Sequence, residues 1–409
     1  MLKIAGVMSG TSLDGIDVAI VATDRSESSQ VEILSYFQRE YPLEIKERLD
    51  KLVNNRQLDA SLVLEEVASL NLELGELYAD AIRTASSKAG LQMEELDLIG
   101  CHGQTVFHKP GDSKTISLQL GSGSMIAEGT GVDTITNFRL KDIAAGGKGA
   151  PLVPLIDFLL YQSSYSHRFV VNIGGITNYT WLPADCKRQE VRGSDASPGN
   201  LMIDAGVQKL TDGQKDYDQA GIMAGQGKLN QILYDRLFQH EFFDSSYLRS
   251  TGRYDFGSQY TEKIIAEASR RGVSDIDIIR TLTEFTASSL VESFQEELVR
   301  EDMDTLKKSD CLEVIISGAG SHNQSLLNFI GREIAERFHN YRTELISLAE
   351  KNYDRYNIPA IDADQKEAVA FALLAREAMM KRPGNLPAVT GASHPVIAGD
   401  LTPGAKVDF

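Results

Sequence analysis

The chain has 409 residues, and its 41 basic and 58 acidic side chains give a formal net charge of −17. This acidic excess argues against nucleic acid as the main partner, because neutralising phosphates requires clusters of Lys and Arg. The length exceeds the size at which one hydrophobic core keeps growing, so two domains are expected.

Cysteine usage and hydropathy predict a cytoplasmic protein without a membrane partner. Cys101, Cys186 and Cys311 are far apart and form no CxxC pair, so neither a disulfide framework nor a zinc site is expected. The first residues lack the apolar core of a signal peptide, and no run of about 18 apolar residues occurs.

The first part of the chain alternates strands with one long helix. Residues 2–8 and 16–23 are apolar runs of strand length around a polar loop, and residues 32–43 predict a third strand. Apolar residues recur every three or four positions over 58–90, which predicts a long helix. Residues 96–108 then read as a buried strand that breaks into a polar loop.

A second cycle begins at residue 168. The segment 168–183 repeats the strand, glycine turn and strand of the opening segment, as an internal duplication would. Amphipathic helices are expected over 200–210, 261–272 and 278–301, and residues 311–338 read as strand, glycine loop and helix. A last helix follows Asp362 or Asp364 as its cap. Residues 137–155 carry three glycines and two prolines and are the expected hinge. The alternation predicts an α/β fold in two domains.

Four loops share one layout, in which an apolar strand delivers glycine and small polar residues at its end. They span residues 10–15, 103–105, 174–177 and 318–323. Glycine lets backbone N–H groups approach a ligand, so such loops suit phosphate or sugar oxygens, although each alone is more often a plain turn. The P-loop, GxGxxG and HExxH patterns are absent, so a nucleotide would be bound in another way.

Asp195 is a candidate general base. It is expected in a loop of small residues before Pro198 and Gly199, which predict a tight turn, and Asn200 could cap the helix that follows. A carboxylate held there suits proton abstraction. The alternative is that Asp195 only stabilises the turn.

Other polar residues form candidate ligand contacts. His102 and Gln104 alternate in an extended segment and could point the same way, toward a sugar. Arg139 suits a carboxylate or phosphate, with an interdomain salt bridge as the alternative. Glu284 begins an otherwise apolar helix, where it indicates a polar site unless it simply faces solvent.

The chain resembles the anhydro-N-acetylmuramic acid kinases. The resemblance runs from residue 6 to about residue 400 and is carried, in order, by "GVMSGTSLDGIDVA", "CHGQTVFH", "FRLKDIAAGGKGAPLVP", "NIGGITN", "SPGNLMIDA", "TLTEFTA", "DADQKEAVAFALLA" and "PGNLPAVTGA". It implies the superfamily of sugar kinases, actin and heat-shock ATPases, and hence two ribonuclease-H-like (actin/hexokinase-type) domains with an interdomain cleft. We place these domains at 1–137 plus about 386–409, and at 138–385.

The resemblance also implies the reaction. Water would open the anhydro ring of 1,6-anhydro-N-acetylmuramic acid while O6 takes the γ-phosphoryl group of ATP, in cell-wall recycling. Asp195 is the implied base, and His102, Gln104, Arg139 and Glu284 are implied sugar contacts. A homodimer is also implied. The implied contacts to ATP, with Asp14 and Asp17 also reaching Mg²⁺ through water, are Gly10, Thr11, Ser12, Leu13, Asp14, Gly15, Ile16, Asp17, Gly174, Gly175, Thr177, Asn178, Gly318, Gly320 and Asn323.

Three departures from the family pattern concern specificity. Asn137 replaces an aspartate and removes a possible acceptor near Arg139, Ala196 and Ser197 alter the turn after Asp195, and Ala319 replaces a glycine. Two other functions therefore stay open: a kinase of another 1,6-anhydro sugar such as levoglucosan, and a non-catalytic sensor of sugar and ATP.

Overall fold

The computed structural model describes residues 1–10, 13, 15–26, 30–54, 60–111, 114–244, 253–301, 303–351, 353–356 and 358–404. The chain divides into two compact units. Unit 1 comprises Met1–Leu160, Asn357–Ile361 and Gln365–Phe409, and unit 2 comprises Tyr161–Tyr356 and Asp362–Asp364. Each unit has its own mixed sheet flanked by helices, which confirms the α/β class in two units. The predicted boundaries at 137/138 and 385/386 differ from this division, since residues 138–160 and 365–385 lie in unit 1.

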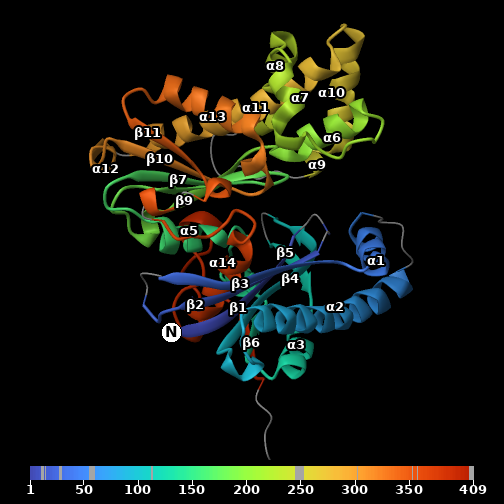
Figure 1. The fold of residues 1–409 in the computed structure, drawn as a ribbon, viewed down its shortest axis with the longest axis vertical. Helices are drawn as coiled ribbons and strands as arrows, with labels where there is room; N and C mark the ends of the chain where they lie inside the picture. Colours follow the sequence, from blue (N-terminus) through green and yellow to red (C-terminus); the bar gives the residue numbers. More distant parts are fainter. Residues whose placement is uncertain are drawn as a thin grey trace, which may run out of the picture. The chain divides into compact units, whose positions relative to one another are not determined.

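The sheet of unit 1 has the strand order β12-β6-β4-β1-β2-β3, with β5 paired to β4 (Figure 1). Strands β1, β2 and β3 are antiparallel neighbours, whereas β4 runs parallel to β1 and to β6. The strands are β1 (Leu2–Ser9), β2 (Gly15–Thr23), β3 (Val31–Glu40), β4 (Leu98–Lys109), β5 (Ile116–Leu120), β6 (Thr134–Thr136) and β12 (Asp400–Thr402).

Helices α2 and α14 pack on the sheet of unit 1 through different kinds of contact. Helix α2 contributes Leu70, Leu74 and Tyr78 to an apolar core with strand residues such as Ile16. Helix α14 approaches a glycine: a Cβ at Gly6 would lie 1.9 Å from the carbonyl oxygen of Ala368, so any larger residue would push the helix away. The helices of this unit are α1 (Leu43–Asn54), α2 (Ala60–Lys88), η1 (Met93–Glu95), α3 (Gly123–Thr130), α4 (Leu140–Ala144), α5 (Val153–Tyr161), α14 (Lys366–Met379) and α15 (Pro387–Thr390).

The start of α14 differs from the prediction. Gln365 takes the N-cap position and makes no side-chain capping hydrogen bond. Asp362 instead accepts a hydrogen bond from the Tyr353 hydroxyl and pairs with Lys351 at 2.8 Å. The predicted cap at Asp362 or Asp364 is therefore wrong, because Asp362 is engaged by the segment before it.

Unit 2 repeats the strand arrangement of unit 1. Its sheet has the order β11-β10-β7-β8-β9, in which β7, β8 and β9 are antiparallel neighbours and β10 runs parallel to β7 and β11. The series β6-β4-β1-β2-β3 has the same order and directions, as the predicted duplication requires. The strands are β7 (His167–Ile173), β8 (Thr177–Leu182), β9 (Arg192–Ser197), β10 (Cys311–Ser317) and β11 (Arg342–Ser347).

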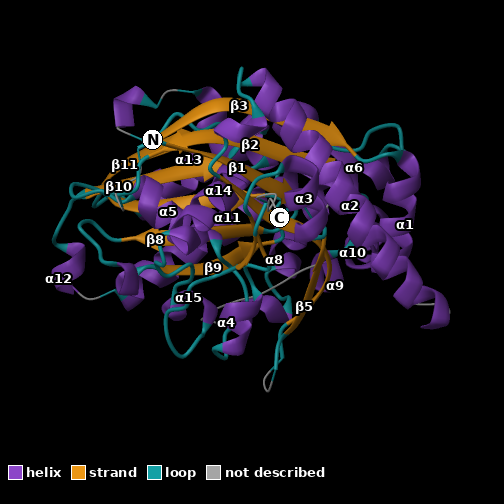
Figure 2. Cartoon of the chain, turned by 90° about the horizontal axis from the view of Figure 1, so that it is seen from below, coloured by secondary structure: helices purple, strands orange, loops and turns teal. Residues whose placement is uncertain are grey.

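Two helical layers complete unit 2. Helices α11 and α13 pack on one face of the sheet, where Phe294 stacks on Phe169 with ring centroids 4.0 Å apart. Helices α6, α8, α9 and α10 contribute to a second apolar cluster that includes Phe285 of α11. Figure 2 shows these helices in purple. The helices are η2 (Arg188–Glu190), α6 (Asn200–Leu210), η3 (Gln219–Gly221), α7 (Ile222–Gln226), α8 (Gln231–Leu237), η4 (Glu241–Asp244), α9 (Arg253–Phe256), α10 (Ser258–Arg270), α11 (Asp275–Arg300), α12 (Met303–Leu306), η5 (Ala319–His322), α13 (Gln324–Arg337), η6 (Leu348–Glu350) and η7 (Asp354–Tyr356).

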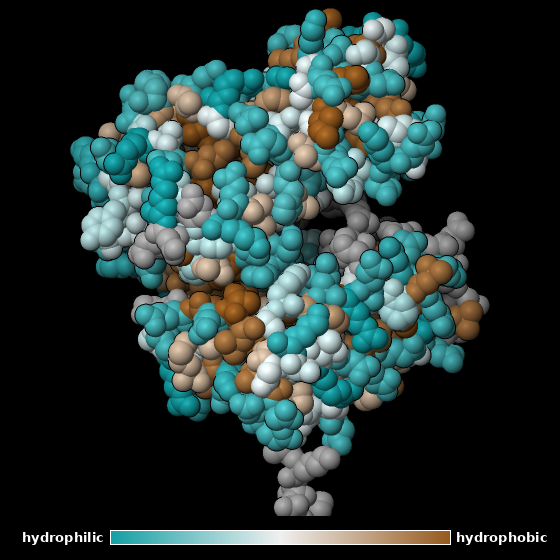
Figure 3. Space-filling view, in the orientation of Figure 1, coloured by the Kyte–Doolittle hydropathy of each residue, from teal (hydrophilic) through white to brown (hydrophobic). Residues whose placement is uncertain are grey.

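The surface is largely polar on the face shown in Figure 3, where hydrophobic residues gather in separate small groups. None of the helices in the described ranges is long and apolar enough to cross a membrane.

Candidate functional site

The opening turn of unit 1 lies between β1 and β2. Leu13 and Ile16, two of its predicted nucleotide contacts, are buried in the apolar core, so only their backbones remain for a ligand. Gly15 is required by packing, since a Cβ there would lie 2.3 Å from the carbonyl oxygen of Arg39. The predicted contacts Thr11, Ser12 and Asp14 lie outside the described residues.

Gln104 holds the start of this turn. It is fully buried, and its Nε2 donates to the carbonyl oxygen of Gly10 at 3.0 Å. Its Oε1 accepts from the Tyr41 hydroxyl at 3.1 Å. Both ends of the amide are thus satisfied within unit 1, which makes Gln104 a brace of the turn; the predicted sugar contact stays a prediction.

Asp17 is the described member of the predicted magnesium pair. Its Oδ1 accepts from the Tyr36 hydroxyl at 2.5 Å. Within the described ranges, no three His, Cys, Asp or Glu side chains gather as a metal site. A water-mediated magnesium contact by Asp17 stays a prediction.

His102 and Arg139 contact each other directly. The Nε of Arg139 lies 3.0 Å from Nε2 of His102. Because arginine can only donate, His102 accepts and must be neutral with its proton on Nδ1. Burial lowers the pKa of His102 well below its usual value, and the Arg139 charge acts in the same direction. Burial also lowers the pKa of Arg139 to about 10, which leaves it cationic at neutral pH. A fixed cation beside a neutral imidazole suits an anionic or hydroxyl-bearing ligand.

His102 and Gln104 do not point the same way, contrary to prediction. His102 packs on the Phe371 ring of α14, whereas Gln104 reaches Tyr41 in the core beneath α2. The register of β1 and β4 shifts here, and Gly103 has a φ of +78°. This irregularity breaks the alternation that an extended strand would show.

The glycine-rich segment after Arg139 is fastened inside unit 1. The buried carboxylate of Asp142 accepts hydrogen bonds from the side chains of Asn385 and Thr390, both at 2.6 Å, and from the Gly149 amide at 2.8 Å. The Gly149 carbonyl then accepts from Arg139 at 2.9 Å. Residues 137–155, the expected hinge, thus lie within one unit and orient Arg139.

Asn137 has a different neighbour from the one expected. Its φ is +57°, a left-handed conformation that asparagine tolerates, and its Nδ2 donates to Asp400 at 3.1 Å. A carboxylate at this position would face that of Asp400. The departure from the family pattern therefore suits this contact.

Glu367 was missed by sequence reasoning. The charge of this half-buried residue of α14 favours the cationic form of Arg139 more strongly than the charge of Asp142 does. The available signal was a glutamate in the apolar stretch "EAVAFALLA".

Three glycine positions in unit 2 are dictated by packing. A Cβ at Gly318 would lie 2.5 Å from Oδ1 of Asn172, and one at Gly320 would lie 2.3 Å from Cγ2 of Ile173. A Cβ at Gly199 would lie 2.5 Å from the carbonyl oxygen of Gly174. The loops after β7, β9 and β10 therefore meet closely around Ile173.

Gly174 and Gly175 have no such explanation. Neither has a positive φ, and a Cβ would come no closer than 3.6 Å and 3.4 Å, respectively, to another residue. A Cβ would make only ordinary van der Waals contacts here, so the protein's own packing does not require glycine at either position. Glycine at these positions leaves the backbone accessible to a ligand, and the nucleotide contact stays a prediction.

Asp195 lies in strand β9 and not in a loop. Gly199, not Asn200, takes the N-cap position of α6, and the amides of Asn200 and Leu201 donate to the carbonyls of Gly174 and Gly175 at 2.9 Å and 3.1 Å. The first turn of α6 is thus bonded to the β7–β8 loop. The predicted cap at Asn200 is wrong, because Asn200 is already the first residue of the helix.

Two other nucleotide candidates of unit 2, Thr177 and Asn323, differ in setting. Thr177 is fully buried, and its hydroxyl has no partner among the described residues. Asn323 is the N-cap of α13 and accepts from the Leu326 amide at 3.0 Å. Any nucleotide contact by either residue stays a prediction.

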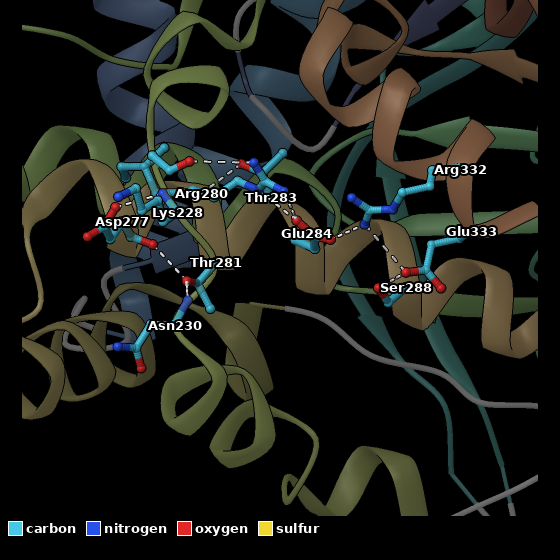
Figure 4. A network of polar contacts seen from close by, with 12 residues as sticks. Lys228, Asn230, Asp277, Arg280, Thr281, Thr283, Glu284, Ser288, Arg332 and Glu333 are labelled. Carbon is cyan, nitrogen blue, oxygen red and sulfur yellow. Dashed lines mark hydrogen bonds and ion pairs between the residues drawn. The ribbon is translucent and has the colours of Figure 1, made fainter. Parts of the chain in front are cut away.

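Glu284 lies inside α11 and forms ion pairs with two arginines (Figure 4). Its Oε2 accepts from Nε of Arg280 at 2.6 Å, and its Oε1 accepts from Arg332 of α13. The Arg280 guanidinium also covers the Phe329 ring at 4.0 Å. Because both carboxylate oxygens are engaged, Glu284 links α11 to α13, and its sugar contact remains a prediction.

Comparisons with known proteins find the same family over nearly the whole length of the chain. The family model for anhydro-N-acetylmuramic acid kinase matches residues 2–404. The anhydro-N-acetylmuramic acid kinase of Caldanaerobacter subterraneus subsp. tengcongensis is 35% identical over 406 residues, covering 98% of this chain and 96% of that protein. The one of Synechococcus elongatus is 37% identical over 407 residues, covering 98% and 99%. Among solved structures, component A of the Acidaminococcus fermentans (R)-2-hydroxyglutaryl-CoA dehydratase is similar, with a TM-score of 0.45, 11% identity and coverage of 93% and 100%.

Proposed function

The chain belongs to the anhydro-N-acetylmuramic acid kinase family, and from this premise we propose that it converts 1,6-anhydro-N-acetylmuramic acid, ATP and water to N-acetylmuramic acid 6-phosphate and ADP. The observation that most supports this proposal is the position of Asp195. Its carboxylate is half-buried and belongs to the same sheet as the strands that precede the glycine loops at 174–175 and 318–320. The step belongs to peptidoglycan recycling, and a cytoplasmic location and a homodimer are part of the proposal.

Asp195 is the general base of this reaction. It takes a proton from the water that attacks the anomeric carbon, because neutral water is too weak a nucleophile for that step. The bond from C1 to O6 breaks, and O6 forms a bond to the γ-phosphorus as ADP leaves. The departing O6 is itself the nucleophile, so it needs no second base.

The nucleotide supplies the phosphoryl group, and the chain positions it. The backbone at Gly174 and Gly175, where no side chain intervenes, suits close contact with phosphate oxygens, and Gly318 and Gly320 shape the neighbouring loop. Mg²⁺ would neutralise phosphate charge, with Asp17 as a described residue that would hold one of its waters. Leu13 and Ile16 anchor the opening turn through their buried side chains.

Arg139 is the proposed contact to the lactyl carboxylate of the sugar. Its cation is held in place by His102 and by the Gly149 carbonyl, so the side chain is preorganised for an anion. A 1,6-anhydro sugar without that carboxylate, such as levoglucosan, would gain nothing from this charge. Arg139→Ala should therefore affect the muramic substrate more than levoglucosan.

A coupled assay of ADP release tests the function. Anhydro-N-acetylmuramic acid should stimulate release, whereas levoglucosan and N-acetylglucosamine should do so weakly. Asp195→Asn should keep ATP binding and lose turnover by about 10²–10⁴-fold. Near-normal turnover of this variant would overturn the base assignment, and no release with any anhydro sugar would favour a non-catalytic sensor.

A further inference from the structure

A row of four polar side chains crosses the sheet of unit 2 at Asp195. Asp195 lies directly opposite Asn178, Asn178 opposite Asn172, and Asn172 opposite Ser317. These residues belong to β9, β8, β7 and β10, four adjacent strands. Directly opposite residues share a face, with Cβ atoms about 4.5–5.5 Å apart. We call these four residues the polar row.

The polar row points away from the core beneath α11 and α13. Val171, Ile173 and Tyr179, the chain neighbours of its asparagines, all lie in that core, so the asparagines face the other side. Asp195 shares that side, because Ala196 is the residue of β9 that reaches the core.

The row next to the polar row on this face is mostly apolar, and charged side chains, Arg168 and Glu313, occur only one row further along. One step deeper, the row consists of Ile315, Val170, Thr180 and Gly193, directly opposite one another in the same order. All four are buried, and only one has a polar side chain. The asparagines therefore do not reflect a generally polar face.

Asn172 connects the polar row to the glycine loops. Its Oδ1 lies 2.5 Å from where a Cβ of Gly318 would be, and its Nδ2 lies 3.9 Å from where a Cβ of Gly174 would be. The amide of Asn172 thus sits between two loops proposed to hold the nucleotide. Asn178 is the next residue of the row and the one beside the base.

We propose that Asn178 is the positioning residue of the general base, with its Nδ2 donating a hydrogen bond to the carboxylate of Asp195. This inference rests on the proposed function and replaces the nucleotide contact predicted for Asn178. The donor fixes the direction of the carboxylate and favours its charged form. The other members of the polar row, Ser317 and Asn172, are not titratable, so they add no charge beside Asp195. Arg192, also on β9, pairs with Glu297 and Glu301 on the α11 side of the sheet.

Two substitutions test this role through the pH profile of kcat/KM. Asn178→Leu removes the donor at similar size, so the acidic limb should move to higher pH by about one unit, and kcat should fall. Asn178→Asp places a second carboxylate opposite Asp195, so the limb should move further in the same direction. The Kd for ATP should stay at the wild-type value in both variants.

Thr180→Val is the matched control. It removes a polar group from the same strand and the same face, one step from the polar row, and the acidic limb should stay where it is in the wild type. An unshifted limb in both Asn178 variants, or a loss confined to ATP affinity, would overturn the inference. Asn178→Asp keeps the side-chain shape and decides the matter if Asn178→Leu does not fold.

The base assignment is tested separately. An inactive Asp195→Asn together with wild-type profiles for the Asn178 variants would reject only the positioning role. An active Asp195→Asn would reject the base itself.

Discussion

Gly318 offers a quantitative test of how the loops of unit 2 are built. Its φ is +81°, and a Cβ there would lie 2.5 Å from Oδ1 of Asn172 and 2.7 Å from the carbonyl oxygen of Ile173. The left-handed backbone costs a non-glycine residue about 1 kcal/mol. The two overlaps, one of them with backbone that cannot rotate away, add about 1–3 kcal/mol. Gly318→Ala should therefore lower the free energy of unfolding of unit 2 by about 2–4 kcal/mol.

The matched control is Gly272→Ala in the same unit. Gly272 has a φ of +79° and no heavy atom within 4 Å of a built Cβ, so only the backbone cost of about 1 kcal/mol applies. Urea denaturation followed by circular dichroism measures both variants, with the transitions of the two units fitted separately. Equal losses of stability in Gly318→Ala and Gly272→Ala would refute the reasoning, because the contacts with Asn172 and Ile173 would then cost nothing.

Two further substitutions should affect different properties, namely ATP affinity in the first and the pH dependence of stability in the second. Gly175→Ala meets no atom closer than 3.4 Å, so stability should stay within about 0.5 kcal/mol of wild type while ATP binding, measured by calorimetry, weakens about tenfold or more; unchanged affinity would remove the loop from the nucleotide site. Burial, with Asp216 and Asp218 nearby, raises the pKa of Asp204 from 3.8 to about 7, so the folded state holds more protons than the unfolded chain between these values. Stability from this group is present below the lower value and is lost as the pH rises toward about 7. Asp204→Asn should thus gain about 1–2 kcal/mol over wild type on going from about pH 4 to pH 8 in urea titrations, and a constant difference would contradict the shift.

Three of the four predicted glycine loops follow a strand end, whereas residues 103–105 lie within β4, so that loop was predicted wrongly. The three loops were predictable because their signal is local. An apolar run followed by glycine and small polar residues appears within about ten positions, and strand periodicity places the loop at the strand end. The duplication was visible for the same reason, since residues 168–183 repeat the outline of the opening segment.

Side-chain direction and long-range partners were not predictable in this way. His102 and Gln104 diverge because of the irregularity at Gly103, which no alternation rule anticipates. Arg332, one of the two partners of Glu284, comes from a different helix 48 positions along the chain. Asn137 and Asp400 are 263 positions apart. Such pairs depend on packing between elements, which one sequence does not state.

The polar row of unit 2, which includes Asn172 and Asn178, has a counterpart in the duplicated sheet of unit 1. In unit 1, Met8 lies opposite Asp17 and Asp17 opposite Gln38, on the strands that correspond to β7, β8 and β9.

Each unit thus has an equivalent position on the third strand of its antiparallel series. This residue is Gln38 on β3 in unit 1 and Asp195 on β9 in unit 2. Only the aspartate can accept a proton from water, because an amide oxygen is far too weak a base. Asp17, at the position equivalent to Asn178, is occupied by Tyr36 instead of a neighbouring carboxylate. For the proposed base, repeated topology therefore explains the position, and the residue on the third strand explains why Asp195 and not Gln38 is proposed.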